Sequence, residues 1–302
     1  MFQFDYLFEE RYTLGIIIGI IFGLVARLYM LQTDYRQYPT YPHGIIVHMS
    51  LGVIAAGLGS VAIPALFEQD YTAVTFLALA AQQFRDVRSM ERETLTKIDS
   101  SELVPRGSTY IEGIALVFEG RNYLVIFTSF FTALFVVLFS FWVGILAGIV
   151  TIIISAMLKT GKTISHVADV YAGKVNVEKS NVYVDDIYMM NVGLKVNQDL
   201  IKQHAIGIVL VPKNKNSAAS LSNLGQRKAI LHDLSTVLGA YRDSGEPALI
   251  PMAKLDINDG RLGILLVVKD CNIDKAVQMV KNVPLLESSV RMPSEAPVKG
   301  GE

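Results

Sequence analysis

The stretch Tyr12–Leu31, YTLGIIIGIIFGLVARLYML, decides the class of protein that this sequence encodes. Its about 20 residues, wound into a helix, are long enough to cross a hydrocarbon core of about 30 Å. Arg27 is the only charged residue of the stretch and lies near its C-terminal end, where a long side chain can extend to the membrane surface. The stretch therefore predicts an integral membrane protein.

Three further apolar runs follow. The run Gly44–Phe67 has no charged residue but contains His48, and Tyr71–Phe84 has only about 14 residues, so it spans a membrane only as part of a longer tilted helix. Tyr123–Leu158 has no Asp, Glu, Lys or Arg over about 36 residues, too many for one crossing. This length predicts a hairpin of two spans with a break near residues 140–144.

We therefore expect about five spans, three within residues 1–84 and two within residues 123–158. The N-terminal segment and the link Glu68–Asp70 are mostly acidic, whereas the other connections are rich in Arg and Lys. By the positive-inside rule, the N-terminus lies outside, and the connection 85–122 and the C-terminal domain lie in the cytoplasm. A four-span alternative, with Tyr71–Phe84 on the membrane surface, breaks this agreement. The predicted location is the cell membrane, with the lipid bilayer as the first partner.

Composition narrows the function classes. Hydrophobic residues make up 51% of the 302 residues and charged residues 18%, below the about 25% that is usual in soluble domains. The net charge of −1 gives no support for nucleic acid as a partner. Cys271 is the only cysteine, so no internal disulfide or paired-cysteine metal site can form. We predict neither a metal nor a cofactor.

Small residues recur at helical spacing within the spans. Gly15, Gly19 and Gly23 form one such stripe, and Gly144 and Gly148 form another, which favours close helix packing within the bundle, with a homo-oligomer as the alternative. His48 is interpreted as hydrogen-bonded to a carbonyl or hydroxyl inside the bundle, with a functional site as the alternative. A transporter is disfavoured because the spans lack Asp, Glu and Lys.

The C-terminal part alternates strand and helix patterns. We expect a strand over Ala205–Pro212, a helix over Gln226–Tyr241, a hairpin closed by Asn258-Asp259-Gly260 and a second helix capped by Asn272. With a last strand at SSVRM, residues 288–292, this order is βαββαβ and predicts a ferredoxin-like α+β domain. We expect this domain to cover residues 205–293 and to contain a polar loop over 213–223. A connector with the first strand or strands should precede it over 159–204, and a disordered tail should follow it over 294–302.

The connection 85–122 begins with alternating acidic and basic residues up to about Lys97, which predicts a solvated helix that continues out of the third run. Pro105 and Gly107 end that helix. Four apolar residues, Ile111, Ile114, Ala115 and Phe118, then recur at helical spacing and predict an amphipathic helix. Glu112 and Glu119 lie seven residues apart on another face. Solvated charges are the favoured interpretation, and an acid–base pair or a cation site is the alternative.

The hexapeptide Tyr110-Ile111-Glu112-Gly113-Ile114-Ala115, with ELVPRG before it and FEGRNYL after it, resembles the signature of the YIEGIA family of integral membrane proteins. Only these six positions carry over as signature residues. The resemblance extends over most of the chain and implies a role in the sporulation of endospore-forming bacteria, with the forespore as one location. It leaves regulated proteolysis open.

The leading functional hypothesis is a regulatory membrane protein whose cytoplasmic domain binds a partner or ligand. The alternative is a membrane-bound protease that acts on a cytoplasmic sporulation factor. Its weak catalytic candidates are Glu112, Glu119 and Asp243, which begins the aspartic-protease-like triplet Asp-Ser-Gly. That triplet occurs once, so a symmetric dimer would be needed. A transporter is the third and least favoured hypothesis.

Overall fold

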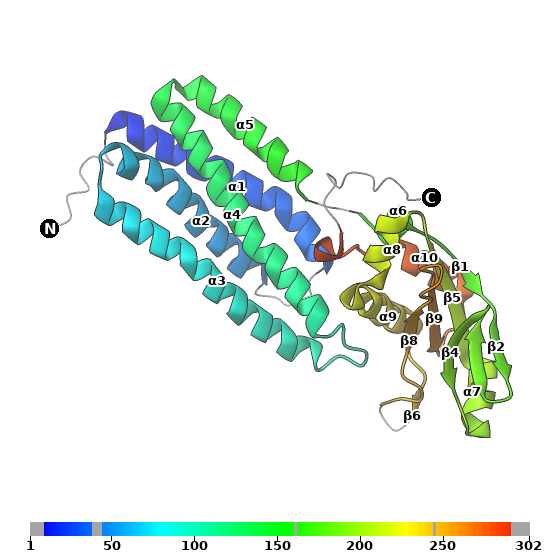
Figure 1. Cartoon of the computed structure of the whole chain (residues 1–302). Helices are drawn as coiled ribbons and strands as arrows, with labels where there is room; N and C mark the ends of the chain where they lie inside the picture. Colours follow the sequence, from blue (N-terminus) through cyan, green and yellow to red (C-terminus); the bar gives the residue numbers. More distant parts are fainter. Residues whose placement is uncertain (1–8, 38–43, 160–161, 244–245, 291–302) are drawn as a thin grey trace. The chain divides into compact units, whose positions relative to one another are not determined.

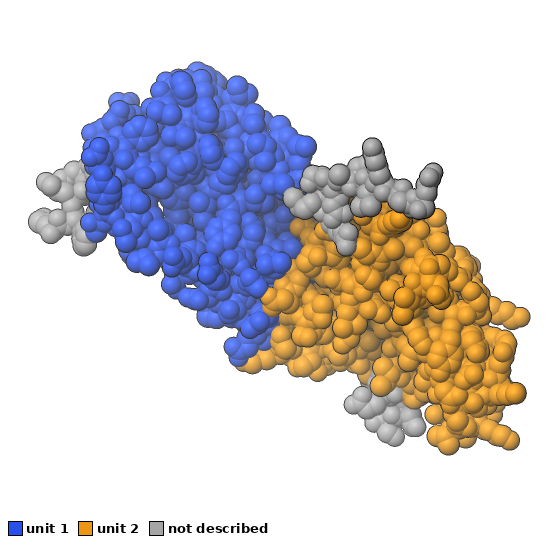
Figure 2. All heavy atoms as spheres, in the orientation of Figure 1, with its two compact units in different colours: residues 1–94, 114–160 blue, residues 95–113, 161–302 orange. Residues whose placement is uncertain are grey.

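The computed structural model describes residues 9–37, 44–159, 162–243 and 246–290. The chain forms two compact units, which Figure 2 distinguishes by colour: residues 1–94 with 114–160, and residues 95–113 with 161–302. The second unit is thus assembled from two separate segments of the chain. The expected tail over 294–302 lies outside the described residues.

Long helices make up the first unit (Figure 1). They are α1 (Glu10–Gln37), α2 (Gly44–Phe67), α3 (Tyr71–Asp99), α4 (Ser108–Leu138) and α5 (Phe141–Met157). The last residues of α3 and the first residues of α4 belong to the second unit, together with the loop between them.

Three of these helices are long and apolar enough to cross a membrane, namely α1 over Glu10–Gln32, α2 and α4. Helix α5 is apolar but has only 17 residues. The expected break is present, because α4 ends at Leu138 and α5 starts after Ser140, whose backbone is extended. Helix α3 continues without interruption from the third apolar run into the charged segment, as predicted. Five crossings therefore remain a prediction.

The glycines of the predicted packing stripes lie against other helices of the first unit. A Cβ added to Gly23 would lie 2.7 Å from Ala56 Cβ of α2, and one added to Gly19 would lie 2.8 Å from the Ser129 carbonyl oxygen of α4. The other members of the stripes meet neighbouring side chains in the same way: Gly15 meets Val137, Gly144 meets Val136 and Gly148 meets Phe22. Within the described residues, these glycines thus serve packing inside one chain.

The second unit contains two main antiparallel sheets. Its strands are β1 (Ala168–Gly173), β2 (Val175–Glu178), β3 (Asn181–Val184), β4 (Ile187–Asn191), β5 (Ala205–Pro212), β6 (Arg242–Asp243), β7 (Glu246–Pro247), β8 (Met252–Leu255) and β9 (Leu262–Val267). Its helices are α6 (Ile164–Val167), α7 (Lys195–His204), α8 (Lys215–Ser222), α9 (Leu224–Leu238) and α10 (Ile273–Asn282). The four-stranded sheet has the order β1-β5-β9-β8, the three-stranded sheet has the order β2-β3-β4, and β6 pairs with β7.

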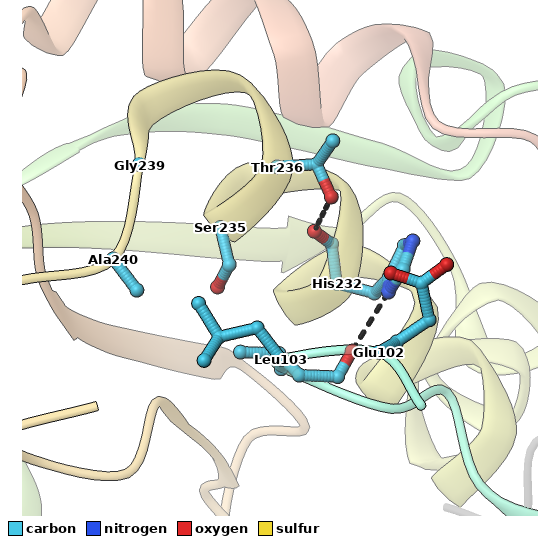
Figure 3. A pocket seen from close by; sticks show the side chains of 8 residues that line it. Glu102, Leu103, His232, Ser235, Thr236, Gly239 and Ala240 are labelled. Atoms are coloured by element: carbon cyan, nitrogen blue, oxygen red, sulfur yellow. Dashed lines mark hydrogen bonds between the residues drawn. The ribbon is translucent and has the colours of Figure 1, made fainter. Parts of the chain in front are cut away.

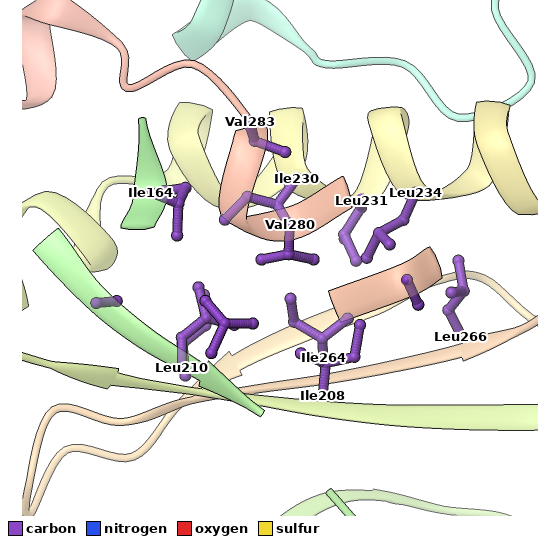
Figure 4. Close-up of a cluster of buried hydrophobic side chains, with 14 of the residues drawn as sticks. Ile164, Ile208, Leu210, Ile230, Leu231, Leu234, Ile264, Leu266, Val280 and Val283 are labelled. Atoms are coloured by element: carbon purple, nitrogen blue, oxygen red, sulfur yellow. The ribbon is translucent and has the colours of Figure 1, made fainter. Parts of the chain in front are cut away.

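The four-stranded sheet has a hydrophobic core on each face. On one face, α9 and α10 direct Ile230, Leu234 and Val280 toward Ile208 and Ile264 of the sheet (Figure 4). On the other face, the three-stranded sheet packs against β5 and β9 through a second cluster that includes Val182, Val184, Ile187, Val209 and Leu265. All six residues of β9 are buried, because this central strand is covered on both sides.

Several predicted elements are confirmed. The strand at Ala205–Pro212 is β5, the hairpin β8–β9 turns at Gly260 with φ +75°, and Asn272 caps α10 by accepting a hydrogen bond from Lys275 N–H at 3.0 Å. A positive φ at Gly260 is the backbone conformation that such a turn requires and that glycine adopts without strain.

Two predictions in this unit are wrong. Residues 287–289, which include the start of the predicted closing strand over 288–292, form a 3-10 helix, and β1 pairs with β5 at that edge of the sheet. Residues 291 and 292 of that prediction lie outside the described residues. The edge is therefore filled by a strand that precedes the domain in the chain. The expected polar loop over 213–223 is mostly α8, because the Asn214 side chain accepts a hydrogen bond from Ser217 N–H at 2.8 Å and caps a helix there.

Candidate functional site

The loop between α3 and α4 folds around the carboxylate at its own start. Asp99 is buried, and its two carboxylate oxygens accept hydrogen bonds from the N–H groups of Arg106 at 2.8 Å and Gly107 at 2.7 Å. Gly107 has φ +82°, a conformation that favours glycine. The loop is therefore held in one conformation by its own backbone contacts.

The same loop packs against α9 within the second unit. The carbonyl oxygen of Val104 accepts a hydrogen bond from His232 Nδ1 at 2.7 Å. Two residues on, Arg106 forms an ion pair with Asp233 at 3.7 Å between Nη2 and Oδ1. These contacts join the loop after α3 to the middle of α9, and Val104 and His232 are 128 residues apart in the chain.

The signature hexapeptide follows this loop and serves mainly packing. Its apolar members Tyr110, Ile111, Ile114 and Ala115 are all buried. A Cβ added to Gly113 would lie 3.0 Å from Leu286 Cδ2, and one added to Gly225 of α9 would lie 2.9 Å from the backbone nitrogen of Tyr110. Glu112 is half-buried. The signature thus marks a place where α4 and α9 approach closely within the second unit.

A cavity of about 250 Å³ lies between the loop and the C-terminal half of α9. Figure 3 shows Ser235 and His232 projecting from α9 toward the loop segment that carries Glu102 and Leu103. The lining residues are Glu102, Leu103, Val104, His232, Ser235, Thr236, Gly239 and Ala240. The cavity therefore combines apolar walls with a small number of polar groups, as ligand sites do.

The polar groups of this cavity include hydrogen-bond acceptors. Because a carbonyl oxygen only accepts, the hydrogen of the neutral His232 ring is on Nδ1, and Nε2 carries a lone pair. Ser235 is 5% exposed, and its hydroxyl has no hydrogen-bond partner within the described part of the chain. Glu102 is exposed and adds a negative charge. The cavity is thus suited to a ligand that donates hydrogen bonds.

Burial raises the pKa of Asp233, the residue beside His232, above its ordinary value of 3.8. The positive charge of Arg106, and that of His232 when protonated, opposes the rise. The folded chain therefore binds this proton more tightly than the unfolded chain, and stability is lost as the pH rises from 3.8 through the raised pKa.

We expect Asp233→Asn to flatten this loss of stability, because asparagine does not ionise in the buried position. The measurement is the thermal unfolding temperature of the full chain in detergent between about pH 4 and about pH 7. Asp199→Asn, at an exposed aspartate of α7, is the matched control and should leave the slope unchanged. An equal slope in Asp233→Asn and the unsubstituted chain would contradict the assignment.

A second polar cluster lies inside the first unit, where two arginines share one carboxylate. Asp34 Oδ2 is 3.3 Å from Arg27 Nη1, and Asp34 Oδ1 is 3.2 Å from Arg121 Nε. All three side chains are at least nine-tenths buried. Arg27 also donates a hydrogen bond from Nε to the carbonyl oxygen of His48 at 3.3 Å. The guanidinium of Arg27 thus serves the interior of the helical unit.

His48 lies beside a carboxylate from α3. Its Nε2 is 3.7 Å from Glu91 Oε1, and its ring centroid is 4.8 Å from that of Phe118. Asn122, on the next turn of α4, is fully buried, and neither atom of its amide has a hydrogen-bond partner among the described residues. His48, Glu91 and Asn122 thus form a group of buried polar side chains inside the first unit.

Among the three catalytic candidates of the protease hypothesis, the structure describes the contacts of Glu119. Glu119 forms an ion pair with Arg88 at 3.0 Å and accepts a hydrogen bond from the Tyr123 hydroxyl at 3.2 Å. Glu112 belongs to the second unit and Glu119 to the first. The side chain of Asp243, in β6, lies outside the described residues. Within the described ranges, no three His, Cys, Asp or Glu side chains form a group that can hold a metal ion.

The sequence did not reveal the partners of Arg27 and His48 in the first unit, nor the polar residues of the cavity in the second unit. Glu91 stands in the alternating charges that predict a solvated helix, and Asp34 and Arg121 flank the apolar runs, where charges are expected in any membrane protein. His232 and Ser235 stand three residues apart on a helix that reads as ordinary core packing. The loop that faces them lies more than 100 residues earlier in the chain, so no local spacing identifies them.

The fold and the cavity define a class: a protein with apolar helices long enough to span a membrane and an α/β unit that carries a polar cavity. Residues 15–296 match the family model described as "YIEGIA protein". This chain therefore belongs to the YIEGIA family. It is 53% identical over 284 residues to "Uncharacterized protein YphB" of Bacillus subtilis (strain 168), covering 94% of this chain and 96% of that protein. No solved structure matches the chain.

Proposed function

We propose that this protein regulates sporulation from the membrane, and that its C-terminal unit binds a cytoplasmic protein partner at the surface formed by α9 and the α3–α4 loop. The observation that carries the proposal is the attachment of this loop to α9 through Val104 and Arg106. The loop continues in the chain directly into α4, one of the three candidate spans. A partner bound beside α9 thus acts on the segment that leads into the membrane.

The proposal includes five crossings, an outside N-terminus and a cytoplasmic C-terminal unit. The three candidate spans, the apolar helix α5 and the basic residues of the α3–α4 connection support this topology. We further infer a ferredoxin-like core in the second unit. Its support is the antiparallel order β1-β5-β9-β8, in which β1 occupies the edge position that a C-terminal strand holds in the usual order.

The role in sporulation is what the resemblance to the YIEGIA family implies, and the relative in Bacillus subtilis provides an organism in which to test it. The test begins with a strain that lacks this relative. We expect fewer heat-resistant spores, and recovery when the present chain is expressed. Arg106→Glu should fail to restore spore formation, because it places a negative charge beside Asp233 and releases the loop from α9.

Lys202→Glu, at an exposed lysine of α7, is the matched control and should restore spore formation. Immunoblots of membrane fractions ensure that both variants are present in equal amounts. Normal spore formation in the deletion strain, or full recovery with Arg106→Glu, would contradict the proposal. Comparative proteomics of the same strains separates regulation from proteolysis. If the protein is a protease, its substrate should accumulate uncleaved in the deletion strain, and no such accumulation is expected if it is a regulator.

A further inference from the structure

We propose that the cavity between the α3–α4 loop and α9 binds an alkylammonium group, and that in the cell a lysine side chain of the protein partner supplies it. The identification of a protein partner as the source of the amine rests on the proposed function. The choice of an alkylammonium group rests on the residues of the cavity alone. The proposal assigns a ligand class to this cavity, and no residue of the signature hexapeptide is among its lining residues.

The charge of the lining favours a cation. Among the described residues that line the cavity, Glu102 has the one carboxylate, and none is Lys or Arg. The arginine of the loop, Arg106, is already paired with Asp233. A negatively charged ligand would therefore face Glu102 with no compensating positive charge in the lining.

The number of acceptors matches an ammonium group. His232 Nε2 offers a lone pair, because Nδ1 holds the ring hydrogen against Val104 O. The Ser235 hydroxyl offers a second acceptor, and the Glu102 carboxylate offers a third. An ammonium group has three N–H donors that can rotate to suit three acceptors, whereas a guanidinium presents a flat, rigid fork.

Burial indicates that a polar group of a ligand belongs in this cavity. Ser235 and His232 are 5% and 6% exposed, respectively. The Ser235 hydroxyl is buried without a hydrogen-bond partner in the described residues, a state that proteins rarely maintain. An ammonium group within reach of this hydroxyl would supply the missing partner.

The shape of the cavity suits a single aliphatic side chain. Its volume of about 250 Å³ lies below the range of roughly 300–1,000 Å³ that is typical of sites for drug-sized ligands. Leu103, Val104 and Ala240 provide apolar contacts for methylene groups. A lysine side chain combines such a methylene stem with a charged tip.

The test uses n-butylamine, which has the length and charge of a lysine side chain, with the full chain in detergent micelles. Binding is followed by NMR of the histidine ring carbons, and the His232 signal is assigned by its loss in His232→Asn. We expect a saturable shift with n-butylamine, a shift at least about tenfold weaker with neutral n-butanol and none with butyrate.

Variants locate the site. Ser235→Ala and Glu102→Gln should each weaken n-butylamine binding by about three- to tenfold, because the first removes an acceptor and the second removes the negative charge. Ser222→Ala, at an exposed serine that ends α8, is the matched control and should bind normally. Equal binding of n-butylamine and n-butanol, or unchanged amine affinity in both cavity variants, would overturn the proposal.

A crosslinking experiment identifies the source of the amine. Ser101→Cys, in a Cys271→Ser background, places a thiol at an exposed position beside Glu102 for a short thiol-to-amine crosslinker. A partner lysine predicts one protein adduct in sporulating cells that n-butylamine suppresses. No protein adduct, together with intact n-butylamine binding, would show that a free small amine is the ligand and overturn the lysine assignment.

This outcome is separable from the proposed function. If n-butylamine binds but Arg106→Glu restores normal spore formation, the cavity chemistry holds and the regulatory proposal fails. If spore formation depends on Arg106 but no amine binds, the regulatory proposal holds and the ligand assignment fails.

Discussion

Asp34→Asn is expected to destabilise the helical unit by about 3–5 kcal/mol, the usual cost of removing one partner from a buried ion pair. In this chain the cost has a specific origin, because the Asp34 carboxylate lies 3.3 Å from Arg27 Nη1 and 3.2 Å from Arg121 Nε. Asparagine keeps the size of the side chain but leaves two buried guanidinium groups without that negative charge. The loss should appear as a lower unfolding temperature of the full chain in detergent.

Asp86→Asn is the matched control, since Asp86 is an exposed aspartate on α3. It should unfold at the temperature of the unsubstituted chain. A second comparison separates charge from shape: Asp34→Leu combined with Arg27→Met and Arg121→Met should recover much of the stability, because apolar replacement of a whole buried ionic group is often tolerated. Equal unfolding temperatures for Asp34→Asn and Asp86→Asn would show that the two arginines do not depend on Asp34.

Among substitutions that add one methyl group to α2, Gly59→Ala is expected to lower the stability of the helical unit the most. The added Cβ would meet Ser129 Oγ and the Ile126 carbonyl oxygen of α4, and would lie 3.1 Å from Ile126 Cα. Two of these three atoms belong to backbone, which cannot move aside as a flexible side chain can. Overpacking of this kind costs typically about 1–3 kcal/mol, and here the helices must separate to relieve it.

Gly57→Ala is the matched control, because it stands two residues away on the same helix and an added Cβ there has no neighbour within 4 Å. Both substitutions bring the same gain in intrinsic helix propensity, so the difference between them reports packing alone. The measurement is the unfolding temperature and the yield of monodisperse protein in detergent. If the two variants behave alike, close packing of α2 on α4 is not what Gly59 provides.

The helical elements were predictable because their signal is local and strong. The break between α4 and α5 falls at Phe139 and Ser140, within one residue of the interval that the length of the apolar run indicates. The continuation of α3 into the charged segment was also predictable, since nothing between Tyr71 and Lys97 ends a helix. Such predictions need only the hydrophobic and charged pattern of neighbouring residues.

The edge of the four-stranded sheet was not predictable in the same way. The sequence pattern predicts SSVRM as the last strand, whereas β1 pairs with β5 in the register Ala168↔Pro212 to Gly173↔Gly207. Backbone hydrogen bonds between strands depend on which segments meet in space. Strand pairing is therefore decided by the tertiary fold, and local propensity only limits the choices.

The candidate sites show the same limit. Arg27 and His48 stand out in the sequence because a charged or titratable residue in an apolar run is rare. Their counterparts Asp34 and Glu91 do not stand out, because both lie among other polar residues. The same holds for Ser235 on α9, whose environment is completed by a loop that ends near Gly107.

The amino-acid sequence by itself determined the kind of protein: apolar runs of the length that crosses a membrane, a family signature between them, and an α/β region at the end of the chain. Only the tertiary structure decided that the signature helix begins beside α9, that the cavity there holds a buried serine with no hydroxyl partner in the described ranges, and that Asp34 joins two arginines. The physical reason is the distance along the chain over which each kind of interaction acts. Hydrophobic periodicity acts over a few residues, whereas burial and electrostatic pairing act between groups that the fold alone brings together.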